Sequence, residues 1–84
     1  MNCRVLYFAR LRERFDLAEE LVALAGTPSV ADLLAHLQAR GGVWAEELGE
    51  GKNFRVAVNQ ALVQTDAAIP DGAEVAIFPP VTGG

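Results

Sequence analysis

The residues best suited to chemistry stand at the end of the chain, which finishes in Gly83 and Gly84. Glycine has no Cβ, so two consecutive glycines let a backbone enter a narrow slot and approach a reacting phosphate closely. The α-carboxylate of Gly84 is a poor electrophile until it is activated, commonly by adenylation, after which an amine, an alcohol or a sulfur nucleophile can attack it. The sequence therefore indicates a terminus that is itself the reagent. The alternative is a frayed end that happens to finish in glycines.

Two prolines set the approach to this terminus. Pro79 and Pro80 fix φ and favour extended backbone, so we expect residues 79–84 to form a flexible C-terminal tail that extends outward. The last four residues could reach about 14 Å at about 3.4 Å each. That reach is enough to enter the active site of another protein.

Length and charge bound the class of protein. The 84 residues are 51% hydrophobic, which predicts a single domain over residues 1–84. The net charge of −4 argues against nucleic acid or an anionic membrane as the main partner and favours a basic partner surface. The N-terminal residues begin a strand pattern directly, without the features of a signal peptide, so we expect a cytoplasmic protein.

The single cysteine and the single histidine offer little chemistry. Cys3 lies in an apolar alternating segment and is expected to be a small core residue. His36 lies off the apolar stripe of its helix and is expected to face solvent. The only glycine pair that resembles a nucleotide loop, Gly49 and Gly51, is too short a pattern. We therefore expect the chain itself to hold no metal and no cofactor.

The elements that must position the terminus follow from hydrophobic periodicity. The expected strands cover residues 3–8, 19–25, 54–58, 61–63 and 74–78, and the expected helices cover residues 9–15, 29–40 and 43–48. Ser29 and Asp32 form a capping-box start for the main helix, which has one apolar stripe. In the last helix Trp44 is expected to face the body, with Glu46 and Glu47 in solvent. This order, with its helical mass in the middle, predicts an α+β fold: a sheet with one main helix packed on one face.

The pattern leaves the second face of the sheet apolar as well. The residues expected there are Leu6, Phe8, Ala57, Ala76 and Phe78, with Leu62 nearby on the short strand. A single-layer sheet would normally place polar residues on its solvent face. An apolar face beside the root of a tail indicates a docking surface. The alternative is that the helix at 9–15, or the loops, folds over these residues.

Three segments carry a family resemblance. Residues 6–13 (LYFARLRE), 58–60 (VNQ) and 71–84 (DGAEVAIFPPVTGG) resemble the small subunit of molybdopterin synthase, with the FPPVTGG ending the most specific part. The resemblance spans the chain and implies a β-grasp (ubiquitin-like) mixed sheet. The segment 16–26 is not a distinctive match, and Tyr7 stands where the family often has Phe.

The resemblance also implies a function. In the family, an E1-like adenylyltransferase that uses ATP and Mg²⁺ adenylates the terminal glycine, which is then converted to a thiocarboxylate. The sulfur passes to cyclic pyranopterin monophosphate inside the large synthase subunit, and two sulfurs build the molybdopterin dithiolene. The assembly is expected to be a heterotetramer of two small and two large subunits. Such a chain is a sulfur-donating subunit rather than a catalyst, and it has neither nucleic-acid nor membrane partners.

The residues of the family site fall on positions of this chain. The reactive terminus corresponds to Gly84, with Gly83 as its slender neighbour. Residues expected to contact the partner are Phe8, Leu62 and Phe78 on the docking surface and Val81 and Thr82 in the inserted tail. Two other classes stay open: another ubiquitin-like sulfur carrier or a protein modifier that acts through the same Gly-Gly end, and a purely non-covalent β-grasp binding module.

Overall fold

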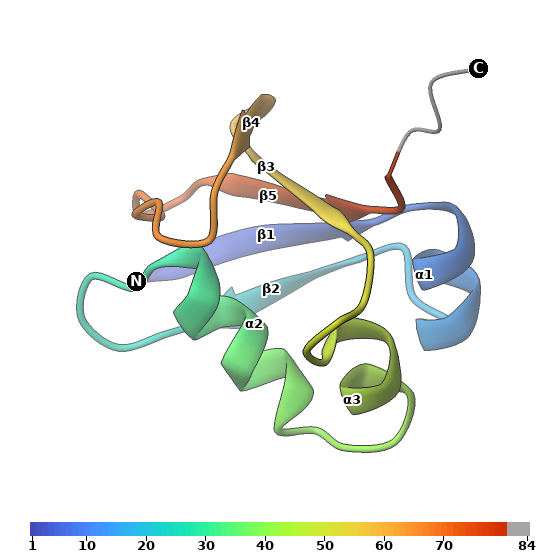
Figure 1. Cartoon of the computed structure of the whole chain (residues 1–84). Coiled ribbons are helices and arrows are strands. Elements are labelled where there is room, and N and C mark those ends of the chain that lie inside the picture. Colours follow the sequence, from blue (N-terminus) through green and yellow to red (C-terminus); the bar gives the residue numbers. More distant parts are fainter. Residues whose placement is uncertain (81–84) are drawn as a thin grey trace.

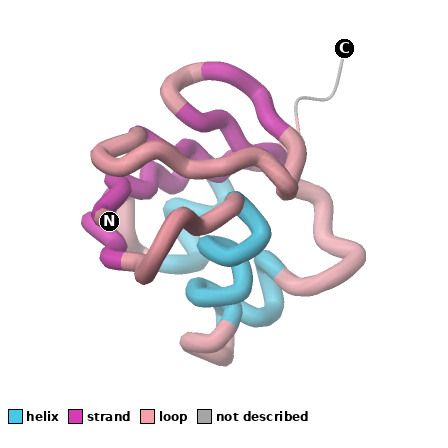
Figure 2. Tube along the Cα trace, turned by 90° about the vertical axis from the view of Figure 1, so that its left-hand side faces the viewer, coloured by secondary structure: helices cyan, strands magenta, loops and turns pink. Residues whose placement is uncertain are grey.

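Alternating apolar residues build a five-stranded mixed sheet, and three helices pack on one of its faces (Figures 1 and 2). The computed structural model describes residues 1–80. The elements are β1 (Asn2–Tyr7), α1 (Ala9–Phe15), β2 (Glu19–Ala23), α2 (Val30–Gln38), α3 (Val43–Leu48), β3 (Arg55–Val58), β4 (Ala61–Val63) and β5 (Glu74–Phe78). The expected α+β class and each expected element are confirmed, with bounds that agree at most ends and differ by one or two residues at the others.

The first and the last strand lie side by side at the centre of the sheet. The strand order is β2-β1-β5-β3-β4, in which only β1 and β5 are parallel. Tyr7 of β1 therefore pairs with Ile77 of β5, and the C-terminal ends of both strands lie at the same end of the sheet. This pairing brings Phe8, the residue after β1, close to Phe78, the last residue of β5. Both lie at the end of the sheet where residues 79 and 80 leave it.

The expectation that the helical mass lies in the middle of the chain is wrong. The helix α1 stands between β1 and β2, and its buried Leu11 and Phe15 join the same core as α2. The short helix therefore packs on the helical face and not over the apolar face opposite. The register along β1 explains why, since Tyr7 faces the helices and contacts Phe15 with ring centroids 5.1 Å apart.

The core lies between the sheet and α2. The apolar stripe of α2 is fully buried, and the predicted capping box is present: Ser29 Oγ accepts from the Asp32 amide at 3.2 Å, and Asp32 Oδ2 accepts from the Ser29 amide at 2.8 Å. Trp44 of α3 stacks on Phe15 with ring centroids 3.8 Å apart, which agrees with its expected orientation. As expected, Cys3 is buried and His36 is exposed.

A polar network ties the sheet to α2 and α3. The Tyr7 hydroxyl donates to Glu20 Oε2 at 2.6 Å, and the Arg40 guanidinium donates to both Glu20 oxygens at 2.8 and 2.9 Å. The same guanidinium lies over the Trp44 ring, 4.4 Å from its centroid. Burial raises the pKa of the Tyr7 phenol, and its hydrogen bond to Glu20 raises it further.

Candidate functional site at the open sheet face

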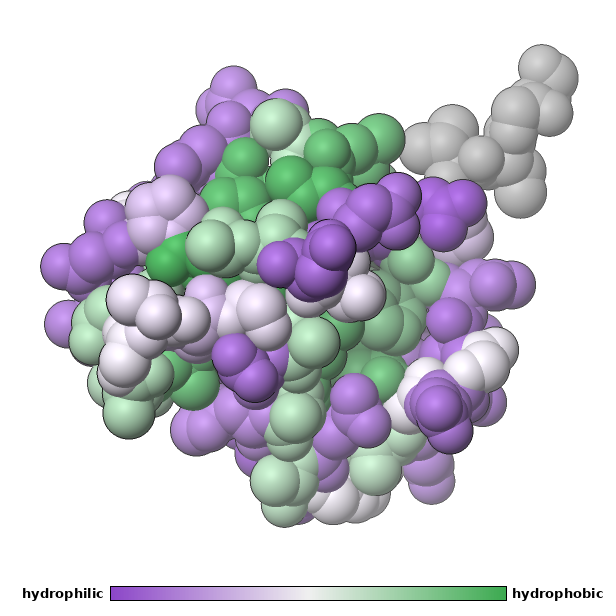
Figure 3. Space-filling model, turned by 60° about the vertical axis from the view of Figure 1, so that its left-hand side comes forward, coloured by the Kyte–Doolittle hydropathy of each residue, from purple (hydrophilic) through white to green (hydrophobic). Residues whose placement is uncertain are grey.

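The face of the sheet opposite the helices carries an apolar row across four strands. Leu6 pairs with Ala76, Ala76 with Ala57, and Ala57 with Leu62, so their side chains share one face from β1 to β4. Leu62 remains 68% exposed. Figure 3 shows hydrophobic residues gathered along the upper edge of the molecule, the side on which the open face lies, between hydrophilic ones.

A second row stands at the end where β1 and β5 finish. Phe8 is 45% exposed, Phe78 is half-buried, and Arg55 pairs with Phe78 across β3 and β5. A shallow groove of about 580 Å³ joins the two rows, and it is lined by Leu6, Phe8, Gln60, Glu74, Ala76 and Phe78. The structure thus places the three expected docking residues, Phe8, Leu62 and Phe78, on one uncovered face. No described element covers this part of the sheet.

The turn between β3 and β4 positions Leu62 on that face. Asn59 and Gln60 have φ values of 49° and 71°, as a two-residue type I′ hairpin requires. Asn59 also fixes the hairpin to β5, because its Oδ1 accepts from the Glu74 amide at 3.0 Å while its own amide donates to the Glu74 carbonyl at 2.8 Å. From the sequence, residues 58–60 were singled out for their family resemblance. Asparagine tolerates positive φ, which is a signal for the turn, but the bond to Glu74 leaves no signal in the neighbouring sequence.

The connection from β1 to α1 turns Phe8 toward the open face. Ala9 has a φ of 50°, in the left-handed region that non-glycine residues rarely adopt. Phe8 keeps an extended backbone as the N-cap of α1, and its carbonyl accepts from the amides of Leu11 and Arg12. The strained residue therefore separates Phe8, on the open face, from Leu11, in the core.

The root of the tail lies beside an ion-pair cluster between α1 and α3. Arg10 donates to both Glu47 carboxylate oxygens at 3.1 Å, and Arg14 donates to Glu47 at 2.9 Å and to Glu46 at 2.6 Å. The hydrogen bond from Arg10 holds the pKa of the Glu47 carboxyl below its ordinary value, with Arg14 acting in the same direction. Glu47 was expected in solvent, but its side chain is only 11% exposed. Periodicity alone could not show that two arginines from another helix cover it.

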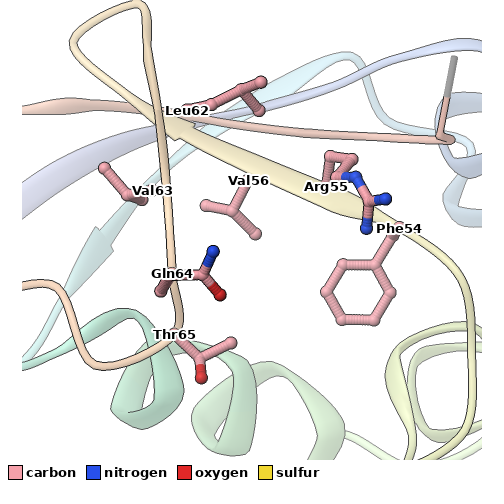
Figure 4. Close-up of a pocket in the computed structure, with 7 residues that line it drawn as sticks. All are labelled: Phe54, Arg55, Val56, Leu62, Val63, Gln64 and Thr65. Atoms are coloured by element: carbon pink, nitrogen blue, oxygen red, sulfur yellow. The ribbon is translucent and has the colours of Figure 1, made fainter.

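A second hollow, of about 460 Å³, opens under the β3–β4 edge (Figure 4). In Figure 4, Val56, Gln64 and Thr65 lie on the helix side of the β3 ribbon, whereas Leu62 lies on the other side. The residues lining it include no acid, no histidine and no cysteine, so they offer no acid–base pair or nucleophile–base pair.

The remaining predictions about the site concern residues 81–84. Val81, Thr82, Gly83 and Gly84 lie outside the described residues. Over residues 1–80, no group of three His, Cys, Asp or Glu side chains could hold a metal ion. None of the helices described here has the length and apolar character needed to cross a membrane.

Comparisons with known proteins support one family. Residues 5–84 match the ThiS family. The chain is 47% identical to the molybdopterin synthase sulfur carrier subunit of Escherichia coli (strain K12), over 96% of this chain and 98% of that protein. A Pyrococcus furiosus protein assigned as molybdopterin converting factor subunit 1 is 32% identical, with a TM-score of 0.84, over 96% of this chain and 99% of the other.

Two further structures bear on the way such chains act. One chain in a complex of subunits 1 and 2 of molybdopterin-converting factor from Helicobacter pylori is 25% identical to this chain, with a TM-score of 0.71. The match covers 100% of this chain and 100% of the other. The small archaeal modifier protein 1 of Haloferax volcanii is also 25% identical, with a TM-score of 0.80, over 95% of this chain and 98% of the other. These similarities confirm the β-grasp fold expected from the sequence.

Proposed function

This chain belongs to the ThiS family, and from this premise we propose that it is the sulfur carrier subunit of a molybdopterin synthase. The observation that carries the proposal is the 47% identity, over nearly the whole chain, to a sulfur carrier subunit of that enzyme. The uncovered apolar face at the root of residues 79–84 supports it further, because a carrier must dock while its terminus reaches a distant reaction centre.

The proposed chemistry uses the Gly84 carboxylate in two steps. A carboxylate oxygen attacks the α-phosphorus of ATP in the activating enzyme, and pyrophosphate leaves. A sulfur nucleophile at the oxidation level of sulfide then attacks the carbonyl carbon and expels AMP, which leaves a thiocarboxylate. ATP and Mg²⁺ would be held by the E1-like adenylyltransferase. Exclusion of water at that site would protect the acyl-adenylate from hydrolysis.

Sulfur delivery would follow in the large subunit. The thiocarboxylate sulfur forms a bond to a carbon of cyclic pyranopterin monophosphate while the bond from that carbon to an oxygen substituent breaks, and the oxygen takes up a proton as it leaves. Water then cleaves the bond between the acyl carbon and sulfur, which regenerates the carboxylate and leaves the sulfur on the pterin. Two such deliveries supply the two dithiolene sulfurs. This chain contributes a nucleophile and a docking surface, so it acts as a subunit and co-substrate. We place this reaction in the cytoplasm.

The proposed docking surface consists of Phe8, Leu62 and Phe78, which would pack on an apolar area of the large subunit. Burying aromatic anchors of this kind is worth about 2 kcal/mol or more each at the centre of an interface. Val81 and Thr82 would lie inside the channel of the large subunit and contact its walls. The Helicobacter pylori complex supports a partner of this kind, and we propose an assembly of two small and two large subunits.

The test is to block the terminus. A chain without Gly84, and a chain with one residue added after Gly84, should keep the fold and lose sulfur transfer. The readouts are circular dichroism, intact mass after incubation with the activating enzyme, ATP and a sulfur donor, and conversion of the pterin by the large subunit. Pterin conversion by either blocked chain would contradict the thiocarboxylate mechanism.

A second candidate is a protein modifier whose Gly84 is joined to a lysine, and it is suggested by similarity to the Haloferax volcanii protein, which is named a small archaeal modifier protein. Protein conjugates that contain this chain, detected in cell extract by mass spectrometry, would favour this candidate. Thiocarboxylate with no conjugates would favour the sulfur carrier.

A further inference from the structure

The net charge of −4 hides a local excess of positive charge where the chain leaves the sheet. A cavity of about 290 Å³ at the root of the tail is lined by Arg10, Leu11, Glu47, Lys52, Asn53, Pro79 and Pro80. One carboxylate, that of Glu47, lines the cavity together with the two cations Arg10 and Lys52.

Glu47 leaves little negative charge for an incoming group to meet. Its carboxylate accepts hydrogen bonds from two guanidiniums, those of Arg10 and Arg14, and is largely covered by them. The other acidic groups of this region, Glu46 and Glu50, are exposed, and neither lines the cavity.

Lys52 has no structural task that explains its position. It stands in the exposed loop between α3 and β3, and among residues 1–80 its ammonium makes neither an ion pair nor a hydrogen bond. Its backbone amide donates to the Gly49 carbonyl at 3.2 Å, which fixes the loop while the side chain stays available. An exposed loop cation that does nothing for the fold is suited to contact a partner.

We propose that Lys52, beside the Arg10–Glu47 ion pair, forms a cationic subsite that receives an acidic side chain at the mouth of the large subunit's channel. This inference rests on the proposed function and adds the chemistry of the partner's rim. The apolar face can supply affinity, but apolar contact is non-directional. A charge contact next to Pro79 and Pro80 would steer the approach and fix the direction in which the tail enters. The overall charge favours a basic partner surface, whereas the rim around the tail would be acidic.

The experiment measures association of the small subunit with the large subunit by stopped-flow or surface plasmon resonance. Lys52→Glu should slow association about five- to tenfold at low ionic strength, with a smaller change in dissociation. Lys52→Arg should stay within twofold of the parent chain. Near 1 M salt the difference should disappear, because the Debye length falls to about 3 Å. The exposed position of Lys52 means that none of these variants should change the fold.

Two controls separate a local subsite from an effect of total charge. Lys52→Gln and Thr27→Glu change the net charge by the same amount, but Thr27 lies in the exposed loop before α2, away from the tail. Thr27→Glu should leave association unchanged, while Lys52→Gln slows it. Equal rates for these two variants would overturn the subsite.

A charge exchange identifies the partner group. Acidic residues at the channel mouth of the large subunit are replaced by lysine one at a time, and one of these changes should restore association of the Lys52→Glu chain. If none restores it, the subsite is wrong even where the parent chain binds. If the parent chain fails to bind any large subunit, the proposed function fails instead.

Discussion

Tyr7 and Glu20 are joined by a 2.6 Å hydrogen bond that links the central strand β1 to the edge strand β2. Arg40, in the connection between α2 and α3, extends the link to the helical layer through two further bonds to the same carboxylate. Because Tyr7 is held on the helical face, its neighbour Phe8 must project from the opposite face. The hydrogen bonds among Tyr7, Glu20 and Arg40 on the helical face therefore help to orient Phe8 on the open face.

The first prediction concerns pH. Burial raises the pKa of Glu20, but hydrogen bonds from Arg40 and Tyr7 outweigh it and hold the pKa below its ordinary value. A carboxyl whose pKa is lowered by folding stabilises the folded state at neutral pH, and this contribution is lost as the pH falls below about 4.3. Glu20→Gln should lower the free energy of unfolding at pH 7 by about 1–3 kcal/mol.

The measurement is denaturant unfolding of both chains at pH 7 and at about pH 3. The difference in the free energy of unfolding between the parent chain and Glu20→Gln should be smaller at about pH 3 than at pH 7, because protonation of Glu20 removes the same charge in the parent chain. Glu50→Gln, in an exposed loop, should change neither value. A gap of constant size at both pH values would mean that the carboxylate charge contributes nothing.

The second prediction concerns strain at Ala9. With its φ of 50°, Ala9→Gly should remove a cost of roughly 1 kcal/mol and add a similar cost in chain entropy, so that stability changes little. Ala35→Gly is the matched control, because Ala35 is exposed inside α2 and glycine there costs about 1 kcal/mol. Thermal unfolding should rank the Ala9 variant above the Ala35 variant. The reverse order would mean that Ala9 is unstrained.

Local patterns predicted most of this fold, whereas long-range pairing did not follow from them. The capping box of α2 and the alternation in β5 depend on residues a few positions apart, so the sequence shows them directly. The parallel pairing of Tyr7 with Ile77 joins opposite ends of the chain. The sequence reached it only through family resemblance, because no periodicity specifies which strands become neighbours.

The candidate site divides in the same way. The apolar face could be predicted, since strand parity fixes the sides of Leu6 and Phe78. The burial of Glu47 depends on two arginines from α1, and Asn59 acts through a bond to β5. Neither contact leaves a signal in the neighbouring sequence.

The third prediction uses two adjacent residues of β5 that face opposite ways. Ile77 is fully buried, so Ile77→Ala should destabilise the free subunit by about 2–5 kcal/mol. Phe78→Ala should destabilise it by less, yet weaken binding to the large subunit by about 2 kcal/mol or more. Chemical denaturation and calorimetric titration give the two quantities. If Phe78→Ala unfolds the subunit and spares association, the docking surface has been placed on the wrong face.

The last prediction concerns Gly83, where a side chain should matter only to the reaction. Gly83→Leu adds bulk where the partner's channel is expected to surround the backbone, and it removes access to positive φ. Docking through Phe8, Leu62 and Phe78 does not involve this position, so complex formation with the large subunit should survive. Acyl-adenylate yield and sulfur delivery should fall together, and Gly83→Ala should lie between the parent and the leucine variant. Full adenylate yield and full sulfur delivery by Gly83→Leu would mean that the tail reacts in open solvent. Glycine would then not be required at residue 83.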